Sequence, residues 1–368
     1  MNVPFIDLNA QYRSIAAEID AAIASTIADS AFIKSPSVTQ FEEEFGAFLG
    51  AEHVIACGNG TDAIEIMLNA MGIGEGDEVL VPAVTWIATS EAAATNGAKP
   101  VFVDVDSETY TIDPKLIEEK ITKATKAIIP VHLYGHPADM AEIMRIAKKH
   151  DLKVIEDCAQ AHGAKIEGQT IGTIGDAATF SFFPTKNLGA YGDAGAMVTN
   201  DEKLAETAQA IANHGQTQRH HHTMDGRNSR MDGLQASILS VKLKYLEKWT
   251  DSRRRIAENY RENLAGLNGI TLPSEPKNGR HVYHLFVIRT ENRNELMDYL
   301  SEHGISSMVH YPKALPFQAC YEYQNNSFSD YPVAKICQDN LLSIPLYPEI
   351  SDEQVAYVVE CISKFVDR

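Results

Sequence analysis

The sequence predicts an α/β fold in which a large domain with a mainly parallel sheet is followed by a small α+β domain. Between about residues 10 and 250, short apolar runs rich in β-forming residues alternate with helical segments. Strands separated by helices need crossover connections, which favour parallel pairing and helices on both faces of the sheet. The length of 368 residues exceeds what one core usually supports. We therefore expect residues 1–249 to form the large domain and residues 250–368 the small one.

The expected elements follow one another in a regular order. The large domain has strands at residues 53–57, 78–81, 100–105, 127–131, 153–156, 178–182 and 196–199, and helices at residues 61–71, 90–96 and 139–150. A long helical pattern from Leu234 past Trp249 connects the domains. The small domain has strands at residues 284–288 and 306–309, and helices at residues 294–303 and 352–365. In such sheets ligands bind beyond the carboxyl ends of the strands, so polar residues there are candidates for a site.

Charge and composition exclude several classes of protein. The formal net charge is -18 and no basic cluster offsets it, so we expect no binding to nucleic acid or to an anionic membrane surface. The five cysteines are odd in number and show no CxxC spacing, which is typical of reduced thiols in a cytoplasm. No apolar run approaches the ~18–20 residues that cross a bilayer. The segment Met1–Asp20 lacks a signal-peptide pattern, and we expect a cytoplasmic protein.

One lysine stands in an aromatic and nearly uncharged segment. Lys186 is the only cation between Ala177 and Tyr191, and no acid interrupts this run before Asp193. Desolvation among apolar groups disfavours the ammonium form and frees the amine for Schiff-base chemistry. A lysine that snorkels from the end of a strand explains the pattern equally well. Other segments have to distinguish the two interpretations.

Two strand ends carry groups that suit a phosphorylated aromatic ligand. In the segment Cys57–Asp62, small residues and the start of a helix can hold a phosphate, although a simple turn with a Thr cap is the alternative. Glu156 and Asp157 end an apolar strand, and alternation sends them to opposite faces. A carboxylate here could bond a pyridine nitrogen and make a bound ring an electron sink, or Asp157 could merely cap the next helix. His162 adds one possible metal ligand, which is too few, so we expect no metal.

Further segments offer contacts to a ligand. Trp86 could stack on an aromatic ring, although a tryptophan is more often part of the core. Arg219–His222 and Gly226–Asp232 are locally cationic loops that suit an anionic ligand or a solvated surface. His310–Pro312 could line a cleft between the domains or belong to ordinary packing. Taken singly, each segment leaves both interpretations open.

The order of these motifs is more informative than any one of them. Gly58-Asn59-Gly60-Thr61 comes first, and then Trp86, an Asp-x-x-Gln strand end, a Ser-x4-Lys segment and an Asn-x-Arg loop. This order resembles the DegT/StrS family of sugar aminotransferases, which are pyridoxal-phosphate (PLP) enzymes of fold type I. The resemblance extends over nearly the whole chain and is most specific from Ser181 to Gly195. It implies a PLP-dependent aminotransferase.

The resemblance also implies a role for each matching residue. Lys186 forms the Schiff base with PLP, and Asp157 pairs with the pyridine nitrogen. Asn228 is expected to reach the phosphate of the neighbouring subunit's cofactor, so that the active unit is a homodimer with shared active sites. The other implied cofactor contacts are Gly60, Thr61 and Ser181 at the phosphate, Trp86 on the ring and Gln160 at the 3-hydroxyl. The implied substrate contacts are Arg230, His310 and Tyr311, and Lys34, which departs from the family pattern, lies in a segment that can border the substrate.

The implied substrates are L-glutamate and a ketone on a nucleotide-linked sugar. The fit around Asn213–Gly215, Asn228–Arg230 and His310–Pro312 is closest to enzymes that aminate carbon 3 of UDP-linked 3-keto-N-acetylglucosaminuronate, for cell-surface polysaccharide such as lipopolysaccharide O-antigen. A dTDP-linked 3-keto-6-deoxyhexose is the main alternative, and a 4-keto sugar is another. Lys34 adds a cation where the family often has a glycine before the proline, which leaves the sugar open.

Functions from other classes are weaker alternatives. A branch of the fold that replaces the Schiff-base lysine with histidine dehydrates sugars, and Lys186 argues against it. A non-catalytic PLP-binding regulator would need no sugar cleft, and a dehydrogenase would use Gly58–Thr61 for a nicotinamide nucleotide. The ordered motifs favour the aminotransferase over both.

Overall fold

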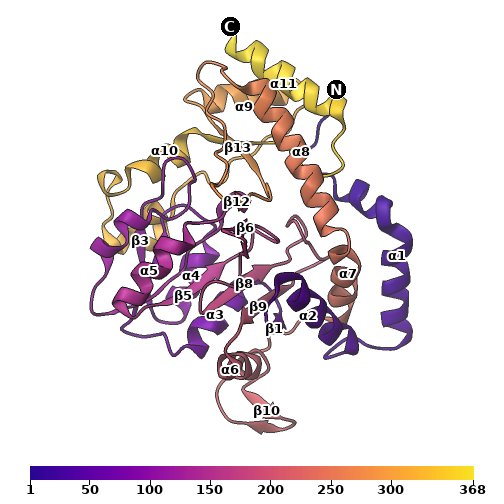
Figure 1. Cartoon of the computed structure of the whole chain (residues 1–368), viewed down its shortest axis with the longest axis vertical. Coiled ribbons are helices and arrows are strands. Elements are labelled where there is room, and N and C mark those ends of the chain that lie inside the picture. Colours follow the sequence, from indigo (N-terminus) through magenta and orange to yellow (C-terminus); the bar gives the residue numbers. More distant parts are fainter.

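A seven-stranded sheet forms the centre of the computed structural model, which describes all residues from Met1 to Arg368 (Figure 1). The strand order is β1-β9-β8-β5-β4-β2-β3. The bounds are β1 (His53–Cys57), β2 (Glu78–Pro82), β3 (Lys99–Val103), β4 (Thr125–Ile128), β5 (Lys153–Asp157), β8 (Ala177–Ser181) and β9 (Gly195–Thr199). Only β9 runs antiparallel to its neighbours, β1 and β8. The predicted mainly parallel sheet is confirmed.

Apolar residues alternate between the two faces of this sheet, and helices cover both faces (Figure 1). On β2, Val79 and Val81 belong to one apolar cluster, whereas Leu80 belongs to the other. Burial on both faces explains why the strands read as continuous apolar runs. The first cluster includes α3 (Gly60–Ala70), α4 (Ala88–Thr95) and α6 (Glu202–Ala212), and the second includes α2 (Pro36–Leu49), α5 (Met140–His150) and α7 (Gly233–Leu243).

The connection to the C-terminal part of the chain consists of two helices. α7 ends at Leu243, and α8 (Leu246–Leu264) begins after Lys244 and Tyr245. The expected continuous helical pattern is therefore interrupted, because periodicity is helical on both sides of so short a break and does not reveal it. The long N-terminal helix α1 (Leu8–Ala28) packs against α7 (Figure 1).

The C-terminal part is an α+β unit around its own apolar cluster. β13 (Phe286–Arg289) and β14 (Leu341–Ile344) pair antiparallel and pack with α8, α9 (Arg293–Glu302) and α11 (Asp352–Val366). The strand expected at residues 306–309 does not form. Ile305 instead bridges Val3, and Met308 bridges Ser343, so two single bridges to different segments replace a continuous ladder. The division of the chain at residue 249 stays a prediction.

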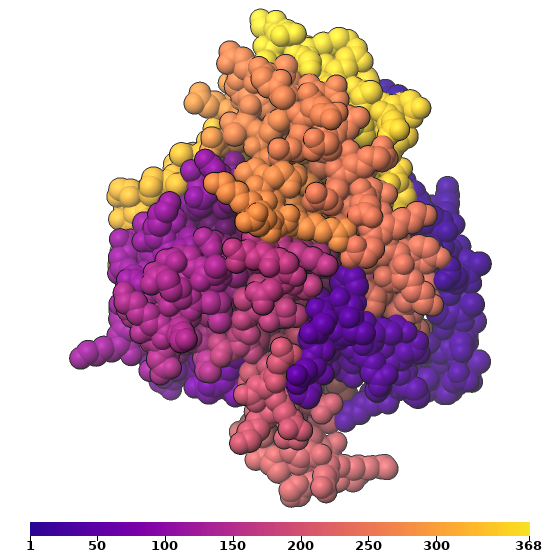
Figure 2. Space-filling model, in the orientation of Figure 1, coloured from indigo at the N-terminus to yellow at the C-terminus, as the bar shows by residue number.

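The remaining elements are short, and one pair projects from the body. β12 (Gly279–Arg280), β6 (Lys165–Ile166) and β7 (Gln169–Thr170) form a small sheet, and α10 (Pro332–Asn340) precedes β14. The hairpin of β10 (Gln216–Gln218) and β11 (His221–His222) extends beyond α6, at the opposite end of the molecule from α9 and α11 (Figures 1 and 2). None of the helices combines the length and the apolar character that crossing a membrane requires.

Candidate active site

A cavity of about 670 Å³ lies at the carboxyl ends of β2, β4, β5 and β8, where the sequence predicted a site. Residues from the C-terminal part of the chain close one side of it. Most of the predicted cofactor and substrate residues line this cavity together: Gly60, Thr61, Trp86, Asp157, Gln160, Ser181, Lys186, His310 and Tyr311.

The phosphate-binding prediction falls on the start of α3. Asn59 caps this helix by accepting a hydrogen bond from Asp62 N. A side chain at Gly60 would put its Cβ 2.7 Å from Ser181 Cβ, so only glycine lets the helix start approach β8 this closely. The unpaired N–H groups of a helix start attract an anion. The residues present therefore fit the phosphate of PLP.

Lys186 stands inside the cavity. Burial lowers the pKa of its amine to about 8, an effect that the nearby Asp157 carboxylate partly opposes. A lysine that reached out to solvent from a strand end would keep its ordinary value. The position of Lys186 on the cavity wall beside Asp157 supports the desolvated lysine over the snorkelling one, and such a lysine is a suitable nucleophile for an aldehyde.

Asp157 ends β5 with its carboxylate in the cavity, and only 5% of the residue is exposed. Its Oδ2 accepts a hydrogen bond from Thr89 Oγ1 (2.8 Å), and its Oδ1 accepts one from Ala159 N (3.1 Å). Both donors are neutral and hold the carboxylate in a fixed orientation. Asp157 therefore remains available to a cationic ligand atom such as a protonated pyridine nitrogen.

Gln160 is oriented by contacts at both ends of its amide. Its Oε1 accepts from Tyr134 N (2.7 Å), and its Nε2 donates to Tyr311 Oη (3.1 Å). Tyr311 in turn lies 5.7 Å from Trp86 between ring centroids. Trp86 lines the cavity and is 57% exposed, so it is accessible to a ligand that stacks on it.

Two residues of this cavity escaped the sequence reasoning. Thr89 lies in α4 among alanines, and a threonine on a helix face that packs against a sheet was the available signal. His284 lines the cavity from the segment before β13, and the sequence pattern predicted it as the first residue of a strand. Neither belongs to a motif with a fixed spacing.

Three predicted residues lie elsewhere in the chain. Lys34 and Arg230 line a separate hollow of about 570 Å³ between α2, β1 and α6. Asn228 is exposed and lines neither hollow. The loop that carries it is tied to the phosphate-binding segment, because Gly58 N donates to Ser229 Oγ (3.1 Å). Within one chain these residues are not brought together with Lys186.

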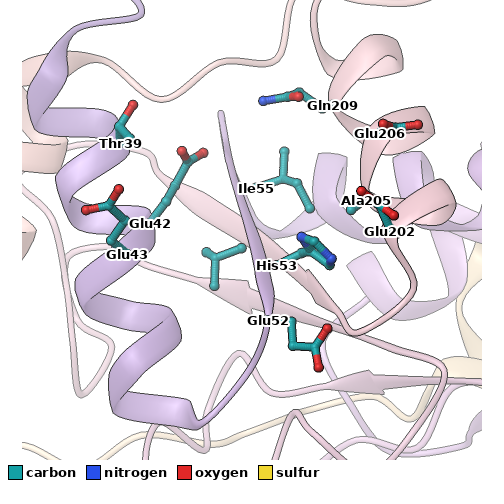
Figure 3. Close-up of a pocket in the computed structure, with 11 residues that line it drawn as sticks. Thr39, Glu42, Glu43, Glu52, His53, Ile55, Glu202, Ala205, Glu206 and Gln209 are labelled. Atoms are coloured by element: carbon teal, nitrogen blue, oxygen red, sulfur yellow. The ribbon is translucent and has the colours of Figure 1, made fainter.

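A third hollow, of about 320 Å³, adjoins the one that Lys34 and Arg230 line, and it is acidic (Figure 3). Burial raises the pKa of Glu42 there to about 7. Neither lysine nor arginine lines the hollow, so it repels the anionic groups of a nucleotide. Its carboxylates are those of Glu42, Glu43, Glu52, Glu202 and Glu206.

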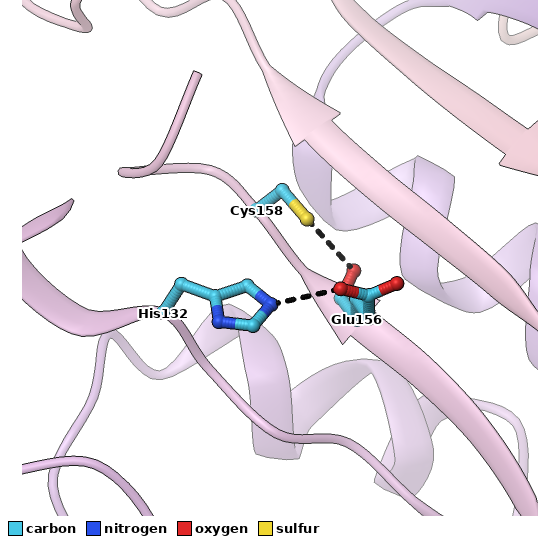
Figure 4. Close-up of side chains that lie close together, drawn as sticks. All are labelled: His132, Glu156 and Cys158. Carbon is cyan, nitrogen blue, oxygen red and sulfur yellow. Dashed lines mark hydrogen bonds and ion pairs between the residues drawn. The ribbon is translucent and has the colours of Figure 1, made fainter. Parts of the chain in front are cut away.

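His132, Glu156 and Cys158 cluster on the other side of β5 and have the ligand types of a metal site (Figure 4). The protein already occupies their polar atoms. His132 Nε2 pairs with Glu156 Oε2 (3.1 Å), and His132 Nδ1 accepts from Ala138 N (3.0 Å). Burial raises the pKa of the Cys158 thiol, which donates to Glu156 O. Because these atoms already have partners within the protein, we interpret the cluster as a structural one that stabilises the sheet.

The sheet order and the cavity together define the class, a PLP-dependent enzyme of fold type I. Residues 13–363 match the DegT/DnrJ/EryC1/StrS aminotransferase family, and the chain belongs to this family.

Three similar proteins match this chain over nearly its whole length. The "Pleiotropic regulatory protein" of Geobacillus stearothermophilus is 47% identical over 99% of both chains. The "dTDP-3-amino-3,4,6-trideoxy-alpha-D-glucose transaminase" of Streptomyces venezuelae is 40% identical over 100% of this chain and 97% of its own. The "UDP-2-acetamido-2-deoxy-3-oxo-D-glucuronate aminotransferase" of Pseudomonas aeruginosa is 40% identical over 98% and 99%.

A solved structure, S. venezuelae DesV in complex with a ketimine intermediate, is similar with a TM-score of 0.98 and 40% identity, covering 100% of this chain and 99% of that one. The chain is thus a PLP-dependent aminotransferase of this family.

Proposed function

We propose that the enzyme transfers the amino group of L-glutamate to carbon 3 of UDP-linked 3-keto-N-acetylglucosaminuronate, in the cytoplasm, for cell-surface polysaccharide synthesis such as O-antigen. The similarity to the P. aeruginosa enzyme supports this substrate. The S. venezuelae enzyme is equally similar, which makes a dTDP-linked 3-keto-6-deoxyhexose the alternative, ahead of a 4-keto sugar. The observation that carries the proposed chemistry is the single cavity that contains both Lys186 and Asp157.

The cavity residues suit the two proton-transfer steps of transamination. Bound PLP supplies an aldehyde that takes up amino groups and a ring that accepts electrons. Lys186 Nζ, once free, is the base that takes a proton from the donor's Cα and later returns one to the sugar carbon. Asp157 holds a proton on the ligand atom that it faces, while the mouth residues Trp86 and Tyr311 limit access of water.

The charges of the cavity support a site shared between two subunits. Lys186 is the only lysine or arginine on its wall, and the wall also carries three carboxylates, those of Asp62, Asp157 and Asp193. A UDP-linked uronate brings further negative charge on its diphosphate and its carboxylate. Additional cations are therefore required. Lys34 and Arg230 of a second copy are the candidates, with Asn228 at the phosphate, and a homodimer is the proposed active unit.

The name of the G. stearothermophilus relative raises the possibility of a regulator. The formal charge of -18 opposes sequence-blind binding to DNA. The desolvated Lys186 beside Asp157 is a chemical site that regulation alone does not need. Catalysis is the function these observations favour.

Reduction with borohydride tests the role of Lys186. The cofactor should become fixed to the peptide that contains Lys186. Lys242 is the natural competitor, because burial lowers its pKa to about 8 as well. Its amine, however, donates to Gly189 O and lies over the rings of Tyr191 and Trp249, outside the cavity. Label on Lys242, or on any lysine except Lys186, would overturn the assignment.

Subunit mixing tests the shared site. Lys186→Ala and Asn228→Ala should each be inactive alone. A mixed dimer should regain up to about a quarter to a half of the activity, because one of its two sites then has both residues intact. No recovery in a mixed dimer verified by mass spectrometry would count against sharing.

The sugar is tested in the reverse direction. The enzyme is supplied with 2-oxoglutarate and either UDP-linked or dTDP-linked 3-amino sugars, and glutamate is measured. We expect the UDP-linked 3-amino uronate to react fastest. Arg230→Gln should lower its kcat/KM about 100-fold while affecting a sugar without the carboxylate much less. Faster turnover of the dTDP-linked sugar would favour the alternative.

A further inference from the structure

The segment of residues 281–285 crosses from the large sheet region to β13 and passes directly beside the cavity. Val282 N donates to Gly135 O (3.1 Å), and Leu285 N donates to Tyr134 O (3.3 Å). A Cβ on Gly135 would lie 2.9 Å from His284 N, so the crossing segment is pressed against this backbone. Arg253 holds it from the other side, with NH1 donating to His284 O (3.3 Å). The position of the His284 backbone is therefore fixed.

The residue after the lysine fixes the ring of His284. Asn187 is buried, its Nδ2 donates to Val282 O (3.1 Å), and its Oδ1 lies 3.1 Å from His284 Nδ1. A carbonyl only accepts, so the amide NH₂ must face Val282 and the amide oxygen must face the imidazole. That oxygen also only accepts, so the proton of the neutral ring is on Nδ1. Nε2 is left with a free lone pair.

Nothing in the chain donates to His284 Nε2, although the residue is 8% exposed and lines the cavity that contains Lys186. Burial lowers the pKa of His284 far below its ordinary value, and the positive charge of Lys186 lowers it further. Both effects favour the neutral ring, in which the lone pair on Nε2 is available.

His310, the other imidazole on the cavity wall, lacks this property. Its Nδ1 lies 2.8 Å from Ser343 Oγ, and a hydroxyl can either donate or accept. Either tautomer of His310 is thus compatible with its surroundings. His284 is the one imidazole of the cavity whose acceptor is fixed.

We propose that His284 is a positioning residue for Lys186, whose amine donates a hydrogen bond to Nε2 of His284 when it is released in the pyridoxamine form of the enzyme. The inference rests on the proposed role of Lys186. The lysine has three N–H donors and must return to the same place after each half-reaction. Because Asn187 joins the lysine segment to the same imidazole, the backbone beside Lys186 and the acceptor for its amine are positioned together.

A matched pair of substitutions separates the two ring nitrogens. His284→Asn keeps a donor toward Asn187 and removes the acceptor at Nε2. His284→Gln extends to the Nε2 position with a carbonyl oxygen and loses the donor toward Asn187. The wild type and both variants are prepared as holoenzyme in the pyridoxamine form, in which Lys186 is free.

The readout is the pH dependence of Lys186 acetylation by acetic anhydride, followed by mass spectrometry with Lys242 as the internal reference. An acceptor stabilises the ammonium and raises its pKa, so His284→Asn should lower the apparent pKa of Lys186 by about one unit. His284→Gln should restore most of this shift. The kcat of His284→Asn should fall about tenfold with KM for the sugar within about twofold. The other titratable groups around the amine are unchanged in both variants: Asp62, Asp157, His162, Asp193, His310 and Tyr311.

Asn187→Leu is the second variant and leaves His284 itself intact. Without the amide oxygen the proton can move to Nε2, so the apparent pKa of Lys186 should fall as in His284→Asn. An unchanged pKa in both variants, with kcat within about twofold of wild type, would overturn the positioning role. Borohydride label on Lys186 in those same variants shows that the proposed function stands independently. Label on another lysine would overturn both proposals.

Discussion

Glu156 and Asp157 are neighbours on β5, yet their carboxylates meet opposite conditions. Glu156 is fully buried and accepts four hydrogen bonds, one from His132 and three from backbone N–H groups of Gly172, Ile174 and Gly175. Asp157 accepts two hydrogen bonds from neutral groups and faces a cavity. The chain therefore supplies a hydrogen bond for every acceptor position of the Glu156 carboxylate, whereas Asp157 can accept further hydrogen bonds.

The difference teaches how to distinguish a structural acid from a functional one where sequence spacing cannot. A buried polar group must be paired, and full pairing by the protein leaves nothing for a ligand. Burial tends to raise the pKa of Glu156, but the bonds from His132 and the backbone hold it below its ordinary value. A carboxylate that faces a cavity and can still accept hydrogen bonds indicates a ligand site.

The largest expected effect separates the two carboxylates by activity. Asp157→Asn should retain the cofactor, because the phosphate loop and Lys186 are untouched, but should lower kcat by about 10⁴-fold through loss of the charge that keeps the ring protonated. Stopped-flow absorbance of the half-reaction with glutamate measures this. Glu156→Gln is the control and should keep the activity of its folded fraction. Comparable turnover in the two variants would show that the two carboxylates do not differ in their role in catalysis.

The second effect concerns stability, where substitution of Glu156 should cost more than substitution of Asp157. Glu156→Ala leaves His132 and three backbone N–H groups unpaired in the interior, which should cost about 3–5 kcal/mol of unfolding free energy. Asp157→Asn replaces one acceptor beside an open cavity and should cost less than about 1 kcal/mol. Urea unfolding followed by circular dichroism compares them. Equal losses would show that both carboxylates support the fold.

This division was only partly accessible from the sequence. Alternation on a strand sends adjacent side chains to opposite faces, and that prediction holds for Glu156 and Asp157. Which face has a cavity depends on Thr89 and on the segment 281–285, which are distant in the chain. Contacts between residues that are far apart in the chain produce no local sequence pattern, so the sequence does not predict them.

The fold was more accessible than its interruptions. The strands of the large sheet were predictable because burial on both faces makes each of them a distinct apolar run. The break at Lys244 and Tyr245 and the missing strand at residues 306–309 were not, since periodicity does not report single bridges or short turns. Arg230 matched the family pattern and Lys34 departed from it, yet no local signal in the sequence shows that both residues lie outside the cavity of their own chain.

A smaller effect tests how firmly Asp157 must be held. Thr89→Val removes the hydroxyl that donates to Asp157 Oδ2 and nearly preserves the side-chain volume. We expect kcat to fall roughly tenfold, corresponding to one lost hydrogen bond to a charged group. Thr89→Ser keeps the donor and should stay within about twofold of wild type. If the serine and valine variants lose activity alike, packing of the methyl group matters rather than the hydrogen bond.

The smallest effect is the pH dependence of the Glu156 cluster. The pKa of Glu156 in the folded chain lies below the ordinary value of 4.5, so its stabilising contribution is complete above that value and is lost as pH falls through the folded pKa. The difference in unfolding free energy between wild type and Glu156→Gln should be constant from about pH 6 to 8 and shrink by up to ~1.4 kcal/mol per pH unit in the acid range. Urea titrations at a series of pH values measure it. A difference that grows on acidification would mean that the folded protein favours the protonated acid, and Glu156 would then resemble an uncharged donor rather than the saturated acceptor that distinguishes it from Asp157.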